Sequence, residues 1–266
     1  MRAILIPIFL ATTFAPFMLS PARADEPTRI RVLSYNIHHG EGTDGKLDLA
    51  RIAKVIEEAK PDVVALQEVD VETERTGKVD QAQELARLTK LHVAFGSSMD
   101  FQGGQYGNAV LSRWPIVSSK VHPLPRFGEG EPRSVFVCEI DLPDQEEGLS
   151  FFATHFGFFA GTEERLASVD AVEEIAKTPP SRLAILAGDF NDVPDGRPIL
   201  KLREAWTLTT DDTLPTVPVK QPTRQIDFIF YRPAQRWRVV ETRVLDEAVA
   251  SDHRAILAEL ELLPAE

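Results

Sequence analysis

Hydrophobic residues follow two alternating patterns along this chain. Short apolar runs of strand length occur at residues 63–67 and 183–187, and such runs, bounded by turn residues, are typical of strands buried on both faces. Residues 47–59 and 163–176 instead place apolar side chains at helical spacing, and Pro61 ends the first of these segments. The alternation of buried strands and helices predicts an α/β fold.

The rest of the chain repeats this rhythm in two halves. We expect a short helix at residues 81–88, loops at 101–107 and 124–132, and further strands at 30–36, 92–96, 108–112, 117–122, 134–142, 149–154, 226–231, 239–245 and 255–260. This order predicts two layered sheets with helices outside and polar strand ends gathered at one rim. No linker composition interrupts it, so we expect one domain over residues 25–266.

The clearest single pattern is the stretch Leu183-Ala-Ile-Leu-Ala-Gly-Asp-Phe-Asn-Asp192. An apolar run reaches Gly188 and then presents Asp189 and Asn191, at the strand end where open α/β sheets bind ligands. Two residues apart in extended backbone, these side chains are expected on the same side. Gly-Asp after a strand is also common in simple turns, so the remaining strand ends decide between a site and a turn.

The first 24 residues differ in pattern from the rest of the chain. Arg2 precedes an apolar run over residues 3–19, and Ala22-Arg23-Ala24 is a small-x-small cleavage pattern. This arrangement predicts a signal peptide, residues 1–24, and export to the periplasm or the medium. An uncleaved anchor helix is the alternative, which Pro7 and Pro16 disfavour. No second apolar stretch predicts a transmembrane segment in the mature chain.

Composition narrows the function classes. Hydrophobic residues make up 43%, enough for a large core. Loss of the two arginines of residues 1–24 changes the formal net charge from −12 to −14. Proteins that bind polyanions usually carry a basic stripe, and so acidic a chain does not indicate general polyanion binding. A nuclease that uses a few local cations and a metal stays possible. The single cysteine, Cys138, lies in an apolar strand pattern and is expected to be a buried, inert thiol.

Amide, acidic and histidine side chains gather at the expected strand ends. Each alone fits a turn residue, a helix cap or a solvated acid, but chance does not place nearly all polar strand ends as these three types. They are Asn36, Glu68, Asn108, His155, Asp189, Asn191, Asp227, Asp252 and His253.

Seven short motifs that contain these residues resemble, in order, those of the endonuclease/exonuclease/phosphatase superfamily, which has the DNase I-like fold. The resemblance spans residues 30 to about 260 and implies a four-layered α/β sandwich, with two packed mixed β-sheets flanked by helices. The motifs are Ser34-Tyr-Asn-Ile-His-His-Gly40, Leu66-Gln-Glu-Val69, Tyr106-Gly-Asn-Ala-Val-Leu-Ser-Arg113, Ala153-Thr-His155, Gly188-Asp-Phe-Asn191, Ile226-Asp-Phe-Ile229 and Ser251-Asp-His253.

The resemblance also implies a metal site. Glu68 matches the direct ligand of a divalent ion, usually Mg²⁺, with Mn²⁺ as the alternative. Asn36 matches a second position of the metal site, and Asp252 matches a further acid near the ion.

Catalytic roles are implied in the same way. Asp189 matches the acid that activates the attacking water, and Asn191 its partner in supporting the transition state. His253 matches the histidine at the phosphate, and Asp227 the carboxylate paired with it. His155 matches a further phosphate-contacting histidine. Asn108, Tyr106 and His38 match or adjoin positions that line the site.

Independent chemistry fits these residue types. Phosphoester hydrolysis needs a positioned water, neutralisation of the phosphoryl oxygens and help for the leaving oxygen. Hard oxygen ligands such as Glu68 suit Mg²⁺ or Mn²⁺, and a carboxylate beside a histidine raises the pKa of the imidazole. His38 and His39 are adjacent and lack the spacing of helical zinc ligands, so we expect no structural zinc site.

We therefore expect a divalent-metal-dependent phosphoester hydrolase, specifically a phosphodiesterase acting on nucleic acid, a phospholipid head group or a small molecule. A phosphomonoesterase on the same residues is the alternative, and a non-catalytic binding module on this fold is a third interpretation. No stable protein partner is expected.

Two further substrate contacts are proposed from less specific signals. In the segment 156–161, aromatic residues lie between glycines, so either they pack into the core or Phe158 or Phe159 contacts a base, acyl or aryl group. Arg113, Arg126 and Arg133 are candidate phosphate contacts, and we choose Arg126 because its loop is the one we expect to vary most between relatives.

Overall fold

A computed structural model describes residues 28–265 except 144, 146, 159–160 and 179–181. The predicted signal peptide, residues 1–24, lies outside the described residues, as does Phe159. Among the helices of the described chain, none is both long and apolar enough to cross a membrane.

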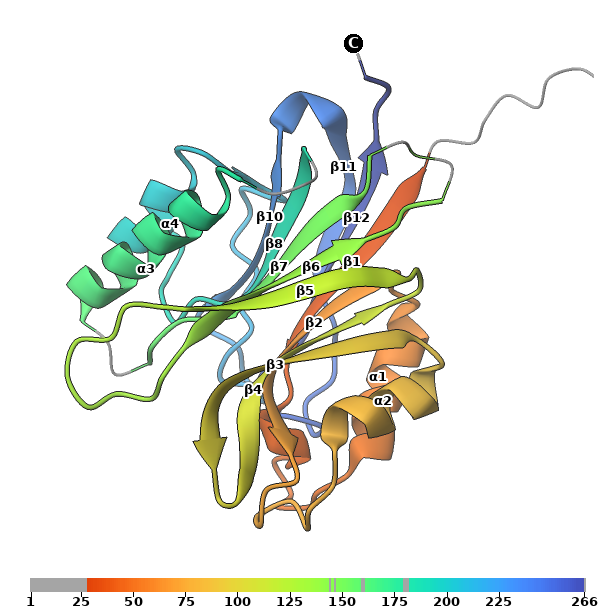
Figure 1. Ribbon diagram of the computed structural model, residues 1–266, viewed down its shortest axis with the longest axis vertical. Helices are drawn as coiled ribbons and strands as arrows, with labels where there is room; N and C mark the ends of the chain where they lie inside the picture. The colour runs from red at the N-terminus through yellow and green to blue at the C-terminus, as the bar shows by residue number, and fades with distance from the viewer. Residues whose placement is uncertain (1–27, 144, 146, 159–160, 179–181, 266) are drawn as a thin grey trace, which may run out of the picture.

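Two six-stranded mixed sheets face each other (Figure 1). The first has the order β11-β12-β1-β2-β4-β3, built from β1 (Arg29–Asn36), β2 (Val63–Val71), β3 (His92–Phe101), β4 (Gly104–Ser112), β11 (Trp237–Val244) and β12 (Ile256–Leu262). The second has the order β5-β6-β7-β8-β10-β9, built from β5 (Ile116–Pro123), β6 (Ser134–Ile140), β7 (Leu149–His155), β8 (Leu183–Asp189), β9 (Thr207–Leu208) and β10 (Asp227–Arg232).

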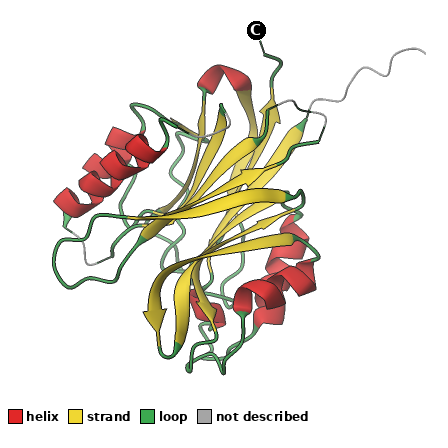
Figure 2. Cartoon of the chain, in the orientation of Figure 1, coloured by secondary structure: helices red, strands yellow, loops and turns green. Residues whose placement is uncertain are grey.

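Helices cover the outer face of each sheet (Figure 2). The first sheet carries α1 (Leu49–Ala59) and α2 (Gln81–Thr89), and the second carries α3 (Thr162–Ile175) and α4 (Arg197–Leu202). Asp48 and Asp80 cap α1 and α2 by accepting backbone N–H bonds from Arg51 and Gln83, both at 3.0 Å. Two one-turn 3-10 helices, η1 (His38–Gly40) and η2 (Ala234–Arg236), complete the order.

Three layers of apolar side chains hold the sandwich together. One lies between the sheets and includes Val63, Phe136 and Ile185; one lies under α1 and α2; and one lies under α3 and α4. Central strands such as β7 and β8 are therefore buried on two faces, as their continuous apolar runs predict, whereas the edge strand β5 is mostly exposed. The predicted fold class, two mixed sheets flanked by helices, is confirmed.

Strand register brings three predicted site residues into one row. β7 pairs in parallel with β8 so that His155 lies opposite Asp189, and β10 pairs antiparallel with β8 so that Asp227 also lies opposite Asp189. Gly188 permits the close approach of β7 here, because a Cβ atom at this position would lie 2.1 Å from the Thr154 carbonyl oxygen. Because this row crosses three hydrogen-bonded strands, the three side chains are attached to rigid backbone.

Two local expectations were wrong. Residues 101–107, expected as a loop, are the turn and start of a β3–β4 hairpin, since backbone pairing with β3 overrides the glycine-rich composition. β2 does not end before Glu68 but continues to Val71, with its pairing to β4 shifted by a bulge between Leu66 and Val69.

Candidate active site

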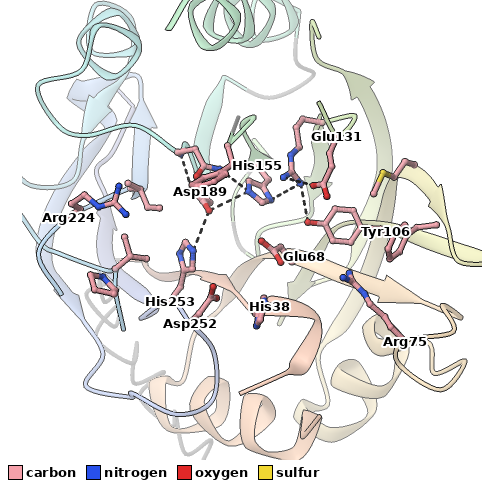
Figure 3. Close-up of a pocket in the computed structure, with 18 residues that line it drawn as sticks. His38, Glu68, Arg75, Tyr106, Glu131, His155, Asp189, Arg224, Asp252 and His253 are labelled. Carbon is pink, nitrogen blue, oxygen red and sulfur yellow. Dashed lines mark hydrogen bonds and ion pairs between the residues drawn. The ribbon is translucent and has the colours of Figure 1, made fainter. Parts of the chain in front are cut away.

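A cavity of about 460 Å³ opens at the rim where the two sheets present their polar strand ends. Asp189, His155 and His253 lie at its centre, with Arg224 on one side and Tyr106 and Arg75 on the other (Figure 3). Asn191, Glu68, Asp252, His38 and Phe158 also line it. The structure thus brings most of the predicted site residues around one space.

Asp189 is buried at the end of β8 and receives hydrogen bonds on both carboxylate oxygens. The Asn191 backbone N–H donates to Oδ1 at 2.9 Å, and the Asn36 amide donates to Oδ2 at 3.2 Å. Burial, reinforced by the nearby Asp227 charge, raises the pKa of Asp189 to about 7. A carboxylate with such a pKa can accept a proton from water near neutral pH.

Asn191 reaches this site by a route that the strand pattern did not predict. Its φ is +50°, so the backbone is not extended after Asp189. Its amide nitrogen donates to the Phe156 carbonyl oxygen at 2.9 Å and lies 3.0 Å from His155 Nε2. The expected proximity of Asp189 and Asn191 therefore comes from a left-handed turn and not from strand alternation.

His253 lies between two carboxylates. Its Nδ1 is 3.0 Å from Asp227 Oδ2, and its Nε2 is 3.7 Å from Asp189 Oδ2. Burial lowers the pKa of His253, but the charge and hydrogen bond of Asp227, with the charge of Asp189, outweigh it and raise the pKa to about 10. Thr216 Oγ1 donates to the same Asp227 oxygen at 2.5 Å. His253 is therefore cationic at neutral pH.

His155 differs from His253 in charge. Burial, the nearby Arg133 and His253 together lower its pKa well below the usual value, so the ring is neutral. Arg133 Nη1 lies 3.2 Å from His155 Nδ1, and a guanidinium only donates. On the other side of the ring, Nε2 lies 3.0 Å from the Asn191 amide nitrogen, which is also a donor, and 3.5 Å from Asp189 Oδ2, so both ring nitrogens face donor groups.

Glu68 lies across the cavity from this row. Its φ of +59° belongs to the β2 bulge, a feature that commonly redirects a side chain beside an active site. The Asn36 amide donates to Glu68 Oε1 at 3.0 Å, while the Asn36 oxygen accepts from the His38 N–H at 3.1 Å. Asn36 thus joins Glu68 to Asp189 through its amide nitrogen.

The donor set fits a divalent cation. In the described chain no lysine or arginine forms an ion pair with Glu68 or Asp252, and both carboxylates line the cavity. Two groups could hold an ion: His38, His39 and Glu68, or Asp189, Asp227 and His253. In the second group His253 is protonated, and a protonated imidazole has no free nitrogen to bind a metal. The group that contains Glu68 is therefore the better metal site.

Two predicted contacts lie elsewhere. Asn108 is buried and donates to the Ser134 carbonyl oxygen of β6 at 3.2 Å instead of lining the cavity, because its side chain points between the two sheets. Arg126 is also absent from the cavity wall, since its guanidinium donates to the Gly130 carbonyl oxygen within its own exposed loop. Arg133, from the same loop, reaches the cavity instead.

Phe158 lines the cavity with 59% of its surface exposed, whereas Phe156 is fully buried. Phe156 therefore packs into the core, whereas Phe158 lies at the cavity, where its contact with substrate stays a prediction.

Sequence reasoning missed Arg75 and Arg224. Asp70 holds Arg75 through two hydrogen bonds of 2.7 and 2.8 Å, and the guanidinium packs over the rings of Phe101 and Tyr106. Arg224 is exposed at the opposite end of the cavity. Neither position carries a sequence signal, because each depends on packing between distant segments.

Comparison with known proteins fits this geometry. A model of the endonuclease/exonuclease/phosphatase family matches residues 33–253, which contain every residue of the site. The chain belongs to this family. It is 26% identical over 246 residues to the uncharacterized protein YbhP of Escherichia coli strain K12, covering 87% of this chain and 96% of that protein.

Solved structures of other proteins share the fold. An endonuclease/exonuclease/phosphatase from Beutenbergia cavernae superposes with a TM-score of 0.73 at 26% identity, covering 88% of this chain and 72% of that one. The mannosyl-6-phosphatase Bt3783 of Bacteroides thetaiotaomicron superposes with a TM-score of 0.73 at 20% identity, covering 87% of this chain and 99% of that one. The family and fold predicted from the motifs are confirmed, and the chain is a family member with the features of a hydrolase.

Proposed function

We propose that this protein is a metal-dependent phosphodiesterase in which Asp189 activates the attacking water. The observation that carries the proposal is the buried Asp189 carboxylate, with a pKa raised to about 7, beside the cationic His253 and the neutral His155. Attack on phosphorus requires a base for the water and a positive charge for the phosphoryl oxygens at one point, and Asp189 and His253 supply them.

The proposed reaction is built on these protonation states. Asp189 takes a proton from a water molecule as it attacks phosphorus, with the Asn191 backbone N–H fixing the carboxylate. The bond from phosphorus to the leaving oxygen breaks, and the leaving group departs as an alkoxide or aryloxide. His253, held cationic by Asp227, donates to a phosphoryl oxygen and stabilises the charge that develops there. Neutral His155, held between Arg133 and Asn191, lies beside the same point and contacts the phosphoryl group.

A divalent ion such as Mg²⁺ or Mn²⁺ would be held by Glu68, with Asp252 and Asn36 nearby. When bound, it would supply charge neutralisation to the phosphoryl group and to the leaving oxygen. The oxygen donors on this side of the cavity suit such an ion.

The shape of the cavity supports a diester of small size. It extends from the central histidines toward Arg224 on one side and toward Tyr106 on the other, so each side offers room for an organic group. Val217 is hydrogen-bonded to Arg224, and Phe101 packs against Tyr106. The volume of about 460 Å³ suits a small molecule or a few atoms of a longer chain. The strongly acidic chain disfavours tight binding of duplex DNA.

A phosphomonoesterase is the second candidate. The specific support is the fold neighbour named mannosyl-6-phosphatase, together with Arg133 and Arg224, which could offset the additional charge of a monoester. We also propose that the protein acts outside the cytoplasm, on the strength of the signal-peptide pattern in residues 1–24.

A substrate panel tests the proposal. The mature protein is incubated with bis-p-nitrophenyl phosphate, p-nitrophenyl phosphate and plasmid DNA, each with Mg²⁺, Mn²⁺ or EDTA. We expect metal-dependent turnover of the diester at a kcat/KM above that of the monoester. Turnover of the monoester alone would replace the diesterase with the phosphatase, and nicking of plasmid would extend the diesterase to nucleic acid.

A further inference from the structure

Three consecutive residues beside the cavity form a left-handed turn. His38, His39 and Gly40 in η1 have φ values of +46°, +43° and +78°. Left-handed backbone costs a residue other than glycine about 1–2 kcal/mol, so two histidines here store strain. Gln81 Nε2 donates to the His39 carbonyl oxygen at 2.7 Å and helps hold the turn. Strain maintained in this way is characteristic of functional sites.

The turn directs both imidazoles toward Glu68. A ring nitrogen of His38, a ring nitrogen of His39 and a carboxylate oxygen of Glu68 all lie within 4.8 Å of one another. The ring centroids of the two histidines are 4.5 Å apart. In a regular helix two adjacent histidines point in different directions and do not bind one ion together. The left-handed turn instead places the two adjacent side chains on the same side.

Glu41 lies beside one nitrogen of each ring, Nδ1 of His38 and Nε2 of His39. The Glu41 carbonyl oxygen lies 3.2 Å from His38 Nδ1, and because a carbonyl only accepts, the His38 proton is on Nδ1 and the lone pair on Nε2. The Glu41 carboxylate lies 3.6 Å from His39 Nε2. Metal-binding histidines typically have such a carbonyl or carboxylate on the second ring nitrogen.

The other ring nitrogen of His39 has no hydrogen-bond partner in the described chain. His39 Nδ1 is buried and makes no hydrogen bond within the described chain. A buried polar atom without a partner is costly unless a ligand satisfies it.

From these contacts we propose that His38 and His39 join Glu68 as ligands of the bound ion. Two imidazoles and one carboxylate favour a first-row transition ion such as Mn²⁺ over Mg²⁺, which prefers oxygen ligands. Donor atoms around an ion with bonds of about 2.1 Å lie roughly 3–4 Å apart, so the three side chains need only a small closure. The inference deepens the proposed function and rests on it for the role of the ion, but ion binding itself can be measured without substrate.

Pulsed electron paramagnetic resonance of Mn²⁺ bound to the metal-stripped protein tests the proposal, because ¹⁴N modulation reports directly bound imidazole. The variant is His38→Asn with His39→Asn, since asparagine tolerates left-handed backbone. His92→Asn is the matched control, an exposed histidine at the opposite end of the first sheet. His38→Asn alone provides a milder change if the double variant fails to fold.

We expect ¹⁴N modulation in the wild type and the control, and its loss in the double variant. By calorimetry, Mn²⁺ affinity should fall at least ~10-fold in the double variant while Mg²⁺ affinity changes by less than ~3-fold. Mn²⁺ binding without ¹⁴N modulation in the wild type, or modulation that persists in the double variant, would overturn the proposal. These outcomes are independent of hydrolysis, so a protein that binds Mn²⁺ through nitrogen but cleaves no phosphoester would contradict only the proposed function.

Discussion

Arg133 Nη1 lies 3.2 Å from Nδ1 of His155, and this contact places a positive charge beside a buried, neutral histidine. The same Nη1 atom is 3.1 Å from the Tyr106 hydroxyl oxygen, which fixes the guanidinium against the cavity wall. Arg133 is therefore a positioning residue for His155, in addition to any contact with substrate.

Replacement of Arg133 should change the orientation and the charge environment of His155. We expect Arg133→Gln to lower kcat by at least ~10-fold, as hydrogen bonds to charged groups contribute about 1.5–3 kcal/mol, with partial recovery in Arg133→Lys. The pKa of His155 should rise at the same time, because a nearby positive charge is lost, and NMR titration of the ring measures it. Arg126→Gln is the matched control from the same loop. A His155 titration identical to that of the wild type would show that Arg133 does not act through this ring.

The pKa values of Asp189 and His253 predict a bell-shaped pH profile. Asp189 must be deprotonated to accept a proton, so kcat/KM should rise with pH up to about 7. A bound cation lowers the pKa of a nearby carboxylate and would shift this acidic limb to lower pH. His253 must be protonated, so activity should fall as pH rises through about 10. Asp227→Asn should move the basic limb to lower pH, because the main cause of the raised pKa is removed. Maximum activity at pH 5 would contradict these protonation states.

Glu68 should control metal dependence. Because its side chain has no cationic partner in the described chain, Glu68→Gln removes a ligand charge and leaves no buried cation unpaired. We expect the metal concentration for half-maximal activity to rise at least ~10-fold with little change in Tm. Glu131→Gln, which alters another acid of the same cavity, is the control. Equal metal requirements in wild type and Glu68→Gln would place the ion elsewhere.

Phe158 offers a test of substrate contact. With 59% of its surface exposed, it contributes little to the core, so Phe158→Ala should fold normally. If the ring packs against an organic group of the substrate, the Michaelis constant for an aryl diester should rise several-fold with kcat nearly unchanged. Phe127→Ala is the comparison, since Phe127 is 60% exposed but does not line the catalytic cavity. The same Michaelis constant in all three proteins would remove Phe158 from the site.

Strand ends could be predicted from sequence because they depend on local pattern. The apolar run before Asp189 and the motif around Asp227 place both carboxylates at strand ends, and sheet pairing then aligns them. The proximity of His155 has the same origin.

Other features could not be predicted because they depend on long-range packing or unusual backbone. Arg75 reaches the cavity only because Asp70 binds it and the β3–β4 hairpin supplies two rings beneath it. The convergence of His38 and His39 needs a left-handed turn, which no periodic pattern indicates. Arg126 and Arg133 have the same residue type in one loop, so sequence alone could not choose between them.

Turnover of bis-p-nitrophenyl phosphate by Asp189→Asn tests the central claim most directly. Asparagine keeps the shape of the side chain but cannot accept the proton of water, and Asp212→Asn, an exposed acid outside the cavity wall, is the control. We predict that kcat falls by at least ~10²-fold in Asp189→Asn while Mn²⁺ affinity and Tm stay close to those of the control. Full turnover by Asp189→Asn would contradict the role of this carboxylate as the base.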